Sequence, residues 1–219
     1  MSRTTPIHLN LTELRGLIFD CDGVLLNSRT ANMHFYNTLR KKAGMPPLTA
    51  QEEEFVHMST YEQALNHIFK GAERAKVSGF VEEMADNFDY FNLLEVEDGL
   101  IAMLTWLKQN KIKLAICTNR LSPLEPLLER FGLEGFFNPL QTASSAQPKP
   151  SPEGLQNILN AWHLKQGAVA YIGDSKVDEA ASAAAQIPFW AFKNPTLSAN
   201  LHITSFTELH DWLKIALNI

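Results

Sequence analysis

Two carboxylates one residue apart follow an apolar run in the stretch GLIFDCDGV, residues 16–24. Like charges this close repel each other, and neither helps to bury a core. Residues two apart in a strand point to the same face, so Asp20 and Asp22 can address one site, and Gly23 permits a tight turn behind them. Two uses fit: ligation of a divalent cation, or a reaction with one carboxylate as nucleophile and the other as general acid. A polar turn is the alternative without chemistry.

Three more polar clusters follow later in the chain. Thr118 and Asn119 end the apolar run IKLAICTN, and Asp174 and Ser175 end the run AVAYIGDS. Lys149 lies in the loop-like stretch TASSAQPKPSPEG, ahead of a helical pattern. Each cluster alone is common at the end of a strand. Together, and in this order, they indicate a site.

The elements that must position these residues alternate between strand and helix. Strand patterns cover residues 15–20, 112–119, 168–174 and 188–192, with a weaker one at 135–142, and helical patterns separate the later ones. Such alternation predicts an α/β fold: a three-layer, Rossmann-like core with a parallel sheet between two layers of helices. Ligands in these sheets bind at the carboxyl ends of the strands, where the strand order reverses. The polar clusters stand at such ends.

One long segment interrupts this alternation. From about residue 29 to 92 the pattern is helical, with amphipathic stretches at 29–44, 49–58, 59–71 and 78–94. Thr49 is expected to cap the second of these helices, because acids fill the turn behind it. We therefore expect residues 1–28 and 93–219 to form the core, and residues 29–92 to form a small helical cap domain inserted after the first strand.

The bulk composition restricts the class of protein. A length of 219 residues allows one ordinary domain with a small insert, and the net charge of -5 argues against nucleic acid as the main partner. No apolar run is long enough to span a bilayer, and the first residues lack the apolar core of a signal peptide. We expect a cytoplasmic protein with no membrane partner, either a monomer or a homodimer. Cys21 and Cys117 lie in strand-like runs and are expected to be buried.

Taken in order, these motifs resemble those of the haloacid dehalogenase-like hydrolase superfamily. The matching residues are DCDGV at 20–24, Thr118 at a strand end, Lys149 in KPSPEG, and GDSKVD at 173–178. The resemblance covers nearly the whole chain and includes the helical cap of the phosphoglycolate phosphatase-like and β-phosphoglucomutase-like branch. It implies a Mg²⁺-dependent phosphatase that hydrolyses a small phosphorylated metabolite, a phosphoglycolate- or sugar-phosphate-like monoester, through an aspartyl-phosphate.

The resemblance also implies a role for each motif residue. Asp20 is expected to be the nucleophile, and Asp22 the general acid and later the general base. Mg²⁺ is expected to bind Asp20, Asp174 and the backbone carbonyl of Asp22. Asp178 could hold Lys149 or a metal-bound water, or could simply favour the start of a helix. The other expected roles are phosphate binding by Thr118, Asn119 and Lys149, and support by Gly23, Ser175 and Asp178.

Alternatives to a phosphatase remain open. The presence of Asp22 favours phosphate esters, because the dehalogenase branch lacks this acid and needs no metal. The position of a cap histidine in β-phosphoglucomutases is Asn32 here, which weakens a sugar-phosphate mutase without excluding it. A catalytically idle member with a binding or regulatory role is the third possibility. Substrate selection is expected from Arg29 and His57 in the cap and from Arg120 behind the second motif.

Overall fold

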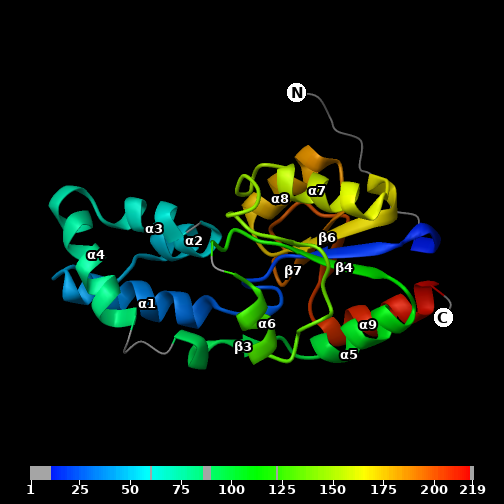
Figure 1. Cartoon of the computed structure of the whole chain (residues 1–219), viewed down its shortest axis with the longest axis horizontal. Helices are drawn as coiled ribbons and strands as arrows, with labels where there is room; N and C mark the ends of the chain where they lie inside the picture. The colour runs from blue at the N-terminus through cyan, green and yellow to red at the C-terminus, as the bar shows by residue number, and fades with distance from the viewer. Residues whose placement is uncertain (1–10, 60, 86–89, 122, 218–219) are drawn as a thin grey trace. The chain divides into compact units, whose positions relative to one another are not determined.

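The computed structural model describes residues 11–59, 61–85, 90–121 and 123–217. The chain divides into two compact units (Figure 1). The sheet unit comprises Met1–Leu25 and Val96–Ile219, and the helical unit comprises Leu26–Glu95. In the described part of the chain, no helix combines the length and the apolar character that crossing a membrane requires.

The sheet unit is built on six parallel strands. Its strands are β1 (Gly16–Phe19), β4 (Lys113–Cys117), β5 (Leu140–Gln141), β6 (Val169–Gly173), β7 (Phe189–Phe192) and β8 (Leu201–Ile203). Their order across the sheet is β5-β4-β1-β6-β7-β8. The chain therefore builds outward from β1 in one direction and then returns to build in the other. The point where the order reverses lies at β1, between β4 and β6, and this is where such sheets bind ligands.

The register places the ends of these three strands side by side. Phe19, the last residue of β1, lies opposite Ile116 of β4 and Ile172 of β6. Every residue of β1, β6 and β7 is buried, as expected for strands covered on both faces.

Helices cover both faces of the sheet. The helices α7 (Glu153–Trp162) and α8 (Lys176–Ala185) pack against each other on one face, and α5 (Leu100–Gln109) and α9 (Phe206–Leu217) on the other (Figure 1). The short α6 (Glu125–Arg130) follows β4. Three 3₁₀ turns complete the described helical elements: Leu11–Glu13, Tyr90–Leu93 and Gln166–Ala168. This is the three-layer α/β arrangement that the alternating pattern predicted.

Alternation along β1 divides the core between the two faces. Ile18 belongs to a buried cluster with Leu155, Ile158 and Trp162 of α7. Its neighbour Phe19 points the other way, toward the rings of Phe137 and Phe206. The two residues before Asp20 are thus packed on opposite faces of the sheet, which fixes the backbone that carries the carboxylate.

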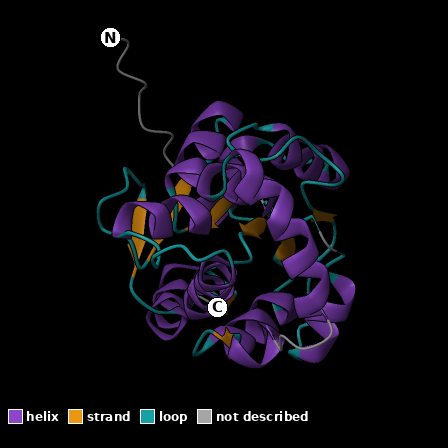
Figure 2. Cartoon of the chain, turned by 90° about the vertical axis from the view of Figure 1, so that its left-hand side faces the viewer, coloured by secondary structure: helices purple, strands orange, loops and turns teal. Residues whose placement is uncertain are grey.

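Among its described residues, the helical unit has four α-helices and its own buried core. They are α1 (Arg29–Lys42), α2 (Ala50–Met58), α3 (Tyr61–Ile68) and α4 (Gly71–Ala85), drawn in purple in Figure 2. Buried residues from these helices and their connections include Tyr36, Leu39, Val56, Leu65 and Phe69. Two short strands, β2 (Leu26–Asn27) and β3 (Glu95–Val96), pair where the chain enters and leaves this unit.

A capping box begins α2, as the sequence predicted. The Thr49 hydroxyl accepts from the backbone N–H of Glu52, and the Thr49 backbone N–H donates to the Glu52 carboxylate at 2.8 Å. These two bonds satisfy donors that the first turn of a helix otherwise leaves open.

Several elements differ from the sequence-based expectation. The short strands β2, β3 and β8 were not expected, because two or three residues are too few for a period-two pattern to be recognised. Helix α4 starts at Gly71 rather than at Ser78. Residues 72–77 were expected to separate two helices, but they are helical because most of them are good helix formers. The break lies just before, at residues 69–70, and Gly71 begins α4 at φ +51°.

Candidate active site

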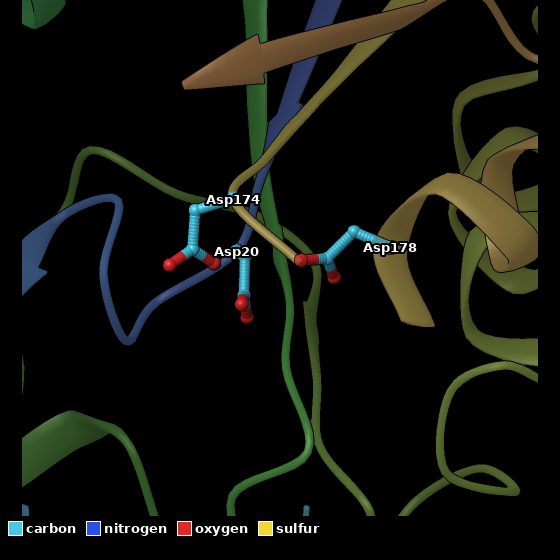
Figure 3. Close-up of side chains that lie close together, drawn as sticks. All are labelled: Asp20, Asp174 and Asp178. Carbon is cyan, nitrogen blue, oxygen red and sulfur yellow. The ribbon is translucent and has the colours of Figure 1, made fainter. Parts of the chain in front are cut away.

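Three carboxylates converge where the sheet order reverses (Figure 3). Asp20 follows β1, Asp174 follows β6, and Asp178 comes from the first turn of α8. Each offers one oxygen, and these three oxygens lie within 4.8 Å of one another. Figure 3 shows the carboxylates of Asp20 and Asp174 beside each other, with Asp178 approaching from the helix. The motifs separated by about 150 residues in the sequence therefore form one cluster.

Lys149 is buried within this cluster and donates to three oxygens. Its ammonium nitrogen lies 2.8 Å from Asp20 Oδ1, 2.6 Å from Asp178 Oδ1 and 2.9 Å from the Tyr171 hydroxyl. An ammonium has three protons, so all of them have an acceptor. The lysine is therefore fixed in place next to Asp20 and is not a solvated loop residue.

Asn119 fixes the backbone that carries this lysine. Its side-chain amide donates to the Lys149 carbonyl at 3.1 Å, and its side-chain oxygen accepts from the Lys149 backbone N–H at 2.7 Å. The loop after β5 is thereby tied to the end of β4. The neighbouring Thr118 is buried, and its hydroxyl accepts from the Arg120 backbone N–H at 3.2 Å.

Asp178 binds Lys149 and also caps the start of α8. One of its oxygens binds Lys149, and the other accepts from the backbone N–H of Ser175 at 3.1 Å in a capping box of α8. The helix comes so close to β6 that a Cβ on Gly173 would lie 2.5 Å from the Asp178 Cβ. Only glycine fits there, which explains the glycine of the GDS motif by packing.

The surroundings alter the acidity of the buried groups. Burial raises the pKa of Asp20 to about 8, and the charges of Asp178 and Asp174 add to this effect, although Lys149 opposes it. Burial also acts on Asp178, but there Lys149 and its hydrogen bond prevail and hold the pKa below its usual value. For Lys149, the two carboxylates overcome burial and raise its pKa. The positive charge of Lys149 alone thus does not offset the effect of burial and of the two neighbouring carboxylates on the ionised form of Asp20.

A divalent cation fits this donor set. Carboxylate oxygens suit Mg²⁺, and its charge would favour the ionised form of Asp20. Asp20 and Asp174 are suitable ligands. Asp178 is the weaker candidate of the three, because both its oxygens already accept hydrogen bonds from Lys149, Tyr171 or Ser175.

Asp22 is engaged by Arg120. The guanidinium donates from Nε to Asp22 Oδ2 at 2.6 Å and from Nη2 to Oδ1 at 2.7 Å. Gly23 follows at φ +77°, in the left-handed region that glycine favours, and turns the chain away from the site. Arg120 was expected to select the substrate, and the structure places it against the second carboxylate of the first motif.

Two residues of the site were missed at the sequence level. The Tyr171 hydroxyl lies 2.7 Å from Asp178 Oδ1 and contacts Lys149, and Asn194 donates to the Asp174 carbonyl at 2.8 Å. The signal for Tyr171 was a hydroxyl inside an otherwise apolar strand. Asn194 lies on the segment after β7, and no motif marks it.

The remaining candidates belong to the helical unit, and the two cysteines belong to the sheet unit. Arg29, in the helical unit, pairs with Glu54 at 3.3 Å with both side chains about half exposed, and the His57 side chain is outside the described residues. Both cysteines are buried and free. Burial raises the pKa of Cys117 to about 12 and also that of Cys21, so neither thiol is available as a thiolate.

Comparisons with known proteins agree with this geometry. Residues 17–192 match the family of haloacid dehalogenase-like hydrolases. Among curated proteins, the phosphoglycolate phosphatase of Chromobacterium violaceum is 26% identical over 94% of this chain and 99% of its own length.

Solved structures show the same fold. A haloacid dehalogenase superfamily hydrolase of subfamily IA from Geobacter sulfurreducens has a TM-score of 0.72 and 30% identity, covering 92% of this chain and 97% of its own. A β-phosphoglucomutase from Clostridium difficile has a TM-score of 0.73, with coverage of 94% and 97%, but at 18% identity it shows the fold alone. The family match spans most of the chain and the motifs meet at one site, so this chain belongs to the haloacid dehalogenase-like hydrolase family.

Proposed function

We propose that this hydrolase is a Mg²⁺-dependent phosphatase that cleaves a small phosphomonoester through an aspartyl-phosphate on Asp20. The observation that carries the proposal is the buried contact between Lys149 and Asp20. Asp20 also lies beside Asp174 in the carboxylate cluster, and Asp22 follows it two positions later in the chain. The broader class, a phosphoric monoester hydrolase, agrees with the family and with the curated relatives.

The metal would be held by Asp20, Asp174 and the backbone carbonyl of Asp22. Mg²⁺ at that position would offset the negative charge of the carboxylates and of the incoming phosphate. Lys149 adds a fixed positive charge, and Thr118 adds a hydroxyl at the next strand end. Phosphoryl transfer depends mainly on such positioning and charge stabilisation.

Asp20 is suited to the nucleophilic step. Its Oδ1 accepts from Lys149 and from the Cys21 backbone N–H, whereas none of the described residues hydrogen-bonds to Oδ2. In the first step a carboxylate oxygen of Asp20 bonds to phosphorus, and the bond from phosphorus to the alcohol oxygen breaks. Asp22 gives that oxygen its proton.

The second step restores the enzyme. Asp22 takes a proton from water as the water oxygen bonds to phosphorus, and the bond from phosphorus to Asp20 breaks. The products are inorganic phosphate and the free carboxylate of Asp20. We propose residues 29–92 as the cap that excludes bulk water during transfer, with Arg29 and His57 as candidates for substrate selection.

Phosphoglycolate is the first substrate to test, because the curated relatives that match this chain are phosphoglycolate phosphatases. Sugar phosphates are the second class. We also predict a cytoplasmic enzyme for small metabolites, and the acidic net charge supports the prediction that it has no nucleic-acid partner.

The test is phosphate release from a panel of phosphomonoesters, with Mg²⁺ and with chelator. We expect release that requires the metal and is lost in Asp20→Asn. Asp211→Asn, an exposed aspartate of α9, is the matched control and should retain full activity. A sugar phosphate that isomerises without release of phosphate would replace the phosphatase with a mutase, and no reaction at all would indicate an idle member of the family.

A further inference from the structure

The contact between Arg120 and Asp22 has a defined geometry. Both oxygens of the carboxylate meet the guanidinium, at 2.6 and 2.7 Å, and the two side chains are only 13% and 19% exposed. Such a two-bond fork fixes the plane of the carboxylate as well as its distance. The fork joins the segments that follow two neighbouring strands, β4 and β1, so Asp22 is held from outside its own turn.

We propose that Arg120 is a positioning residue for Asp22, holding the carboxylate in the orientation from which it passes a proton to the departing alcohol. The proposal rests on the proposed function, which makes Asp22 the general acid. Before the step, Asp22 carries the proton that it took from water in the previous turnover; in the step, this proton moves from a carboxyl oxygen of Asp22 to the ester oxygen as the bond from phosphorus to that oxygen breaks. Arg120 keeps all its protons throughout.

The position of Asp22 explains why such a support is needed. Asp22 lies beyond the end of β1, and Gly23 turns the chain directly behind it. The buried strand β1 thus ends directly before Asp20 and three residues before Asp22. General acid catalysis is sensitive to placement, and an error of about 1 Å in the position of a reacting group can cost about 100-fold in rate.

Direct binding of the substrate by Arg120 is the competing interpretation. A guanidinium has five N–H donors and Asp22 receives two of them, so a substrate carboxylate would have to bind donors outside the fork. The geometry favours the contact with Asp22, because one edge of the guanidinium is already matched to it. The experiment below separates these two roles by the chemistry of the leaving group.

The variant is Arg120→Met, which keeps an unbranched stem, although a shorter one, and removes the fork. It is compared with Arg15→Met, an exposed arginine at the opposite end of β1. Three esters are used: p-nitrophenyl phosphate, ethyl phosphate and phosphoglycolate. The quantity measured is kcat/KM, because it reports on the steps up to the release of the alcohol and not on the later hydrolysis of the aspartyl-phosphate.

The expected result follows from the need for a proton. An alkoxide leaves only with a proton from Asp22, whereas p-nitrophenolate leaves without one. Arg120→Met should therefore lower kcat/KM about 10- to 100-fold more for ethyl phosphate and phosphoglycolate than for p-nitrophenyl phosphate. In the Asp22→Asn background, Arg120→Met should add little, because the group that it positions is gone. Arg120→Lys, a point charge without the fork, should recover only part of the loss.

Four results would overturn the proposal. They are an equal loss for all three esters, a loss confined to phosphoglycolate, a full further loss in the Asp22→Asn background, and a faster variant. A loss confined to phosphoglycolate would assign Arg120 to the substrate carboxylate.

Crystal structures of the wild type and Arg120→Met test the positioning without any turnover. The wild type should show the Asp22 carboxylate in the fork, and the variant should show it rotated or spread over several orientations. An Asp22 that keeps its orientation without Arg120 would overturn the proposal, even for a protein that hydrolyses none of the esters. A failure of the proposed function, seen as absence of phosphate release, is thus separate from a failure of this inference.

Discussion

Replacing Tyr171 with phenylalanine removes one hydroxyl from the centre of the buried network. That hydroxyl contacts Lys149 at 2.9 Å, Asp178 at 2.7 Å and the Cys117 carbonyl at 3.2 Å, and Tyr171 is fully buried. In the variant, one N–H of the Lys149 ammonium loses its acceptor, and water has little room to replace it.

The cost can be worked from this contact pattern. A buried donor left without a partner costs about 1–3 kcal/mol, and more when it is charged, so we expect a loss of about 2 kcal/mol in the free energy of unfolding. For a chain of this size, that loss lowers Tm by about 4–8 °C. The burial of the ring itself is unchanged, so the loss arises from the hydroxyl.

The assay is thermal unfolding at neutral pH followed by circular dichroism, with Tyr61→Phe as the matched control. Among the described residues, none hydrogen-bonds to the Tyr61 hydroxyl, so its loss should change stability by less than about 0.5 kcal/mol. A Tm for Tyr171→Phe within the range of that control would refute the reasoning. It would mean that the ammonium is satisfied by Asp20 and Asp178 alone.

The other predictions concern packing, capping and metal binding. Gly173→Ala places a Cβ 2.5 Å from that of Asp178, so it should destabilise the protein by about 1–3 kcal/mol in denaturant unfolding, and wild-type stability would contradict the close approach. Thr49→Ala should cost about 1 kcal/mol by removing the cap of α2, measured the same way. The hydrogen bond from the Thr49 backbone N–H lowers the pKa of Glu52 to about 2. The ionised carboxylate therefore stabilises the fold at a pH above its ordinary pKa of 4.5, and this contribution is lost as the pH falls toward 2. A Glu52 pKa near 4.5 measured by NMR would refute this. Burial raises the pKa of Asp20 to about 8 in the metal-free protein, so Mg²⁺ binding should release a proton below that pH. By calorimetry the affinity should then rise with pH up to about 8, and an affinity independent of pH between 6 and 8 would contradict it.

The sheet could be predicted from the sequence because its strands are buried on both faces. Apolar runs that stop at an acid or a threonine mark both the strand and its carboxyl end, as Asp20, Thr118 and Asp174 do. The edge strand β8 could not be recognised in the same way, since it has three residues and is partly exposed. Local pattern is informative for central strands and weak at the edge.

The side-chain partners were less accessible to sequence reasoning. Arg120 is 98 positions from Asp22, and Asn119 is 30 positions from Lys149. Only the strand order, with β4 between β5 and β1, brings these residues together. Tyr171 was read as part of an apolar strand because a buried hydroxyl is distinguished from a buried ring only by the partners that surround it.

The central claim is that Asp20 carries the phosphoryl group, and a burst experiment on Asp22→Asn tests it most directly. With p-nitrophenyl phosphate and Mg²⁺, this variant should complete the first step without a general acid and then stall without a base. The account predicts a rapid burst of p-nitrophenolate equal to the number of active sites, with phosphate covalently bound at Asp20 in the quenched protein and no burst in Asp20→Asn. Turnover of the ester by the wild type with no burst in Asp22→Asn, or with phosphate bound at another residue, would contradict it.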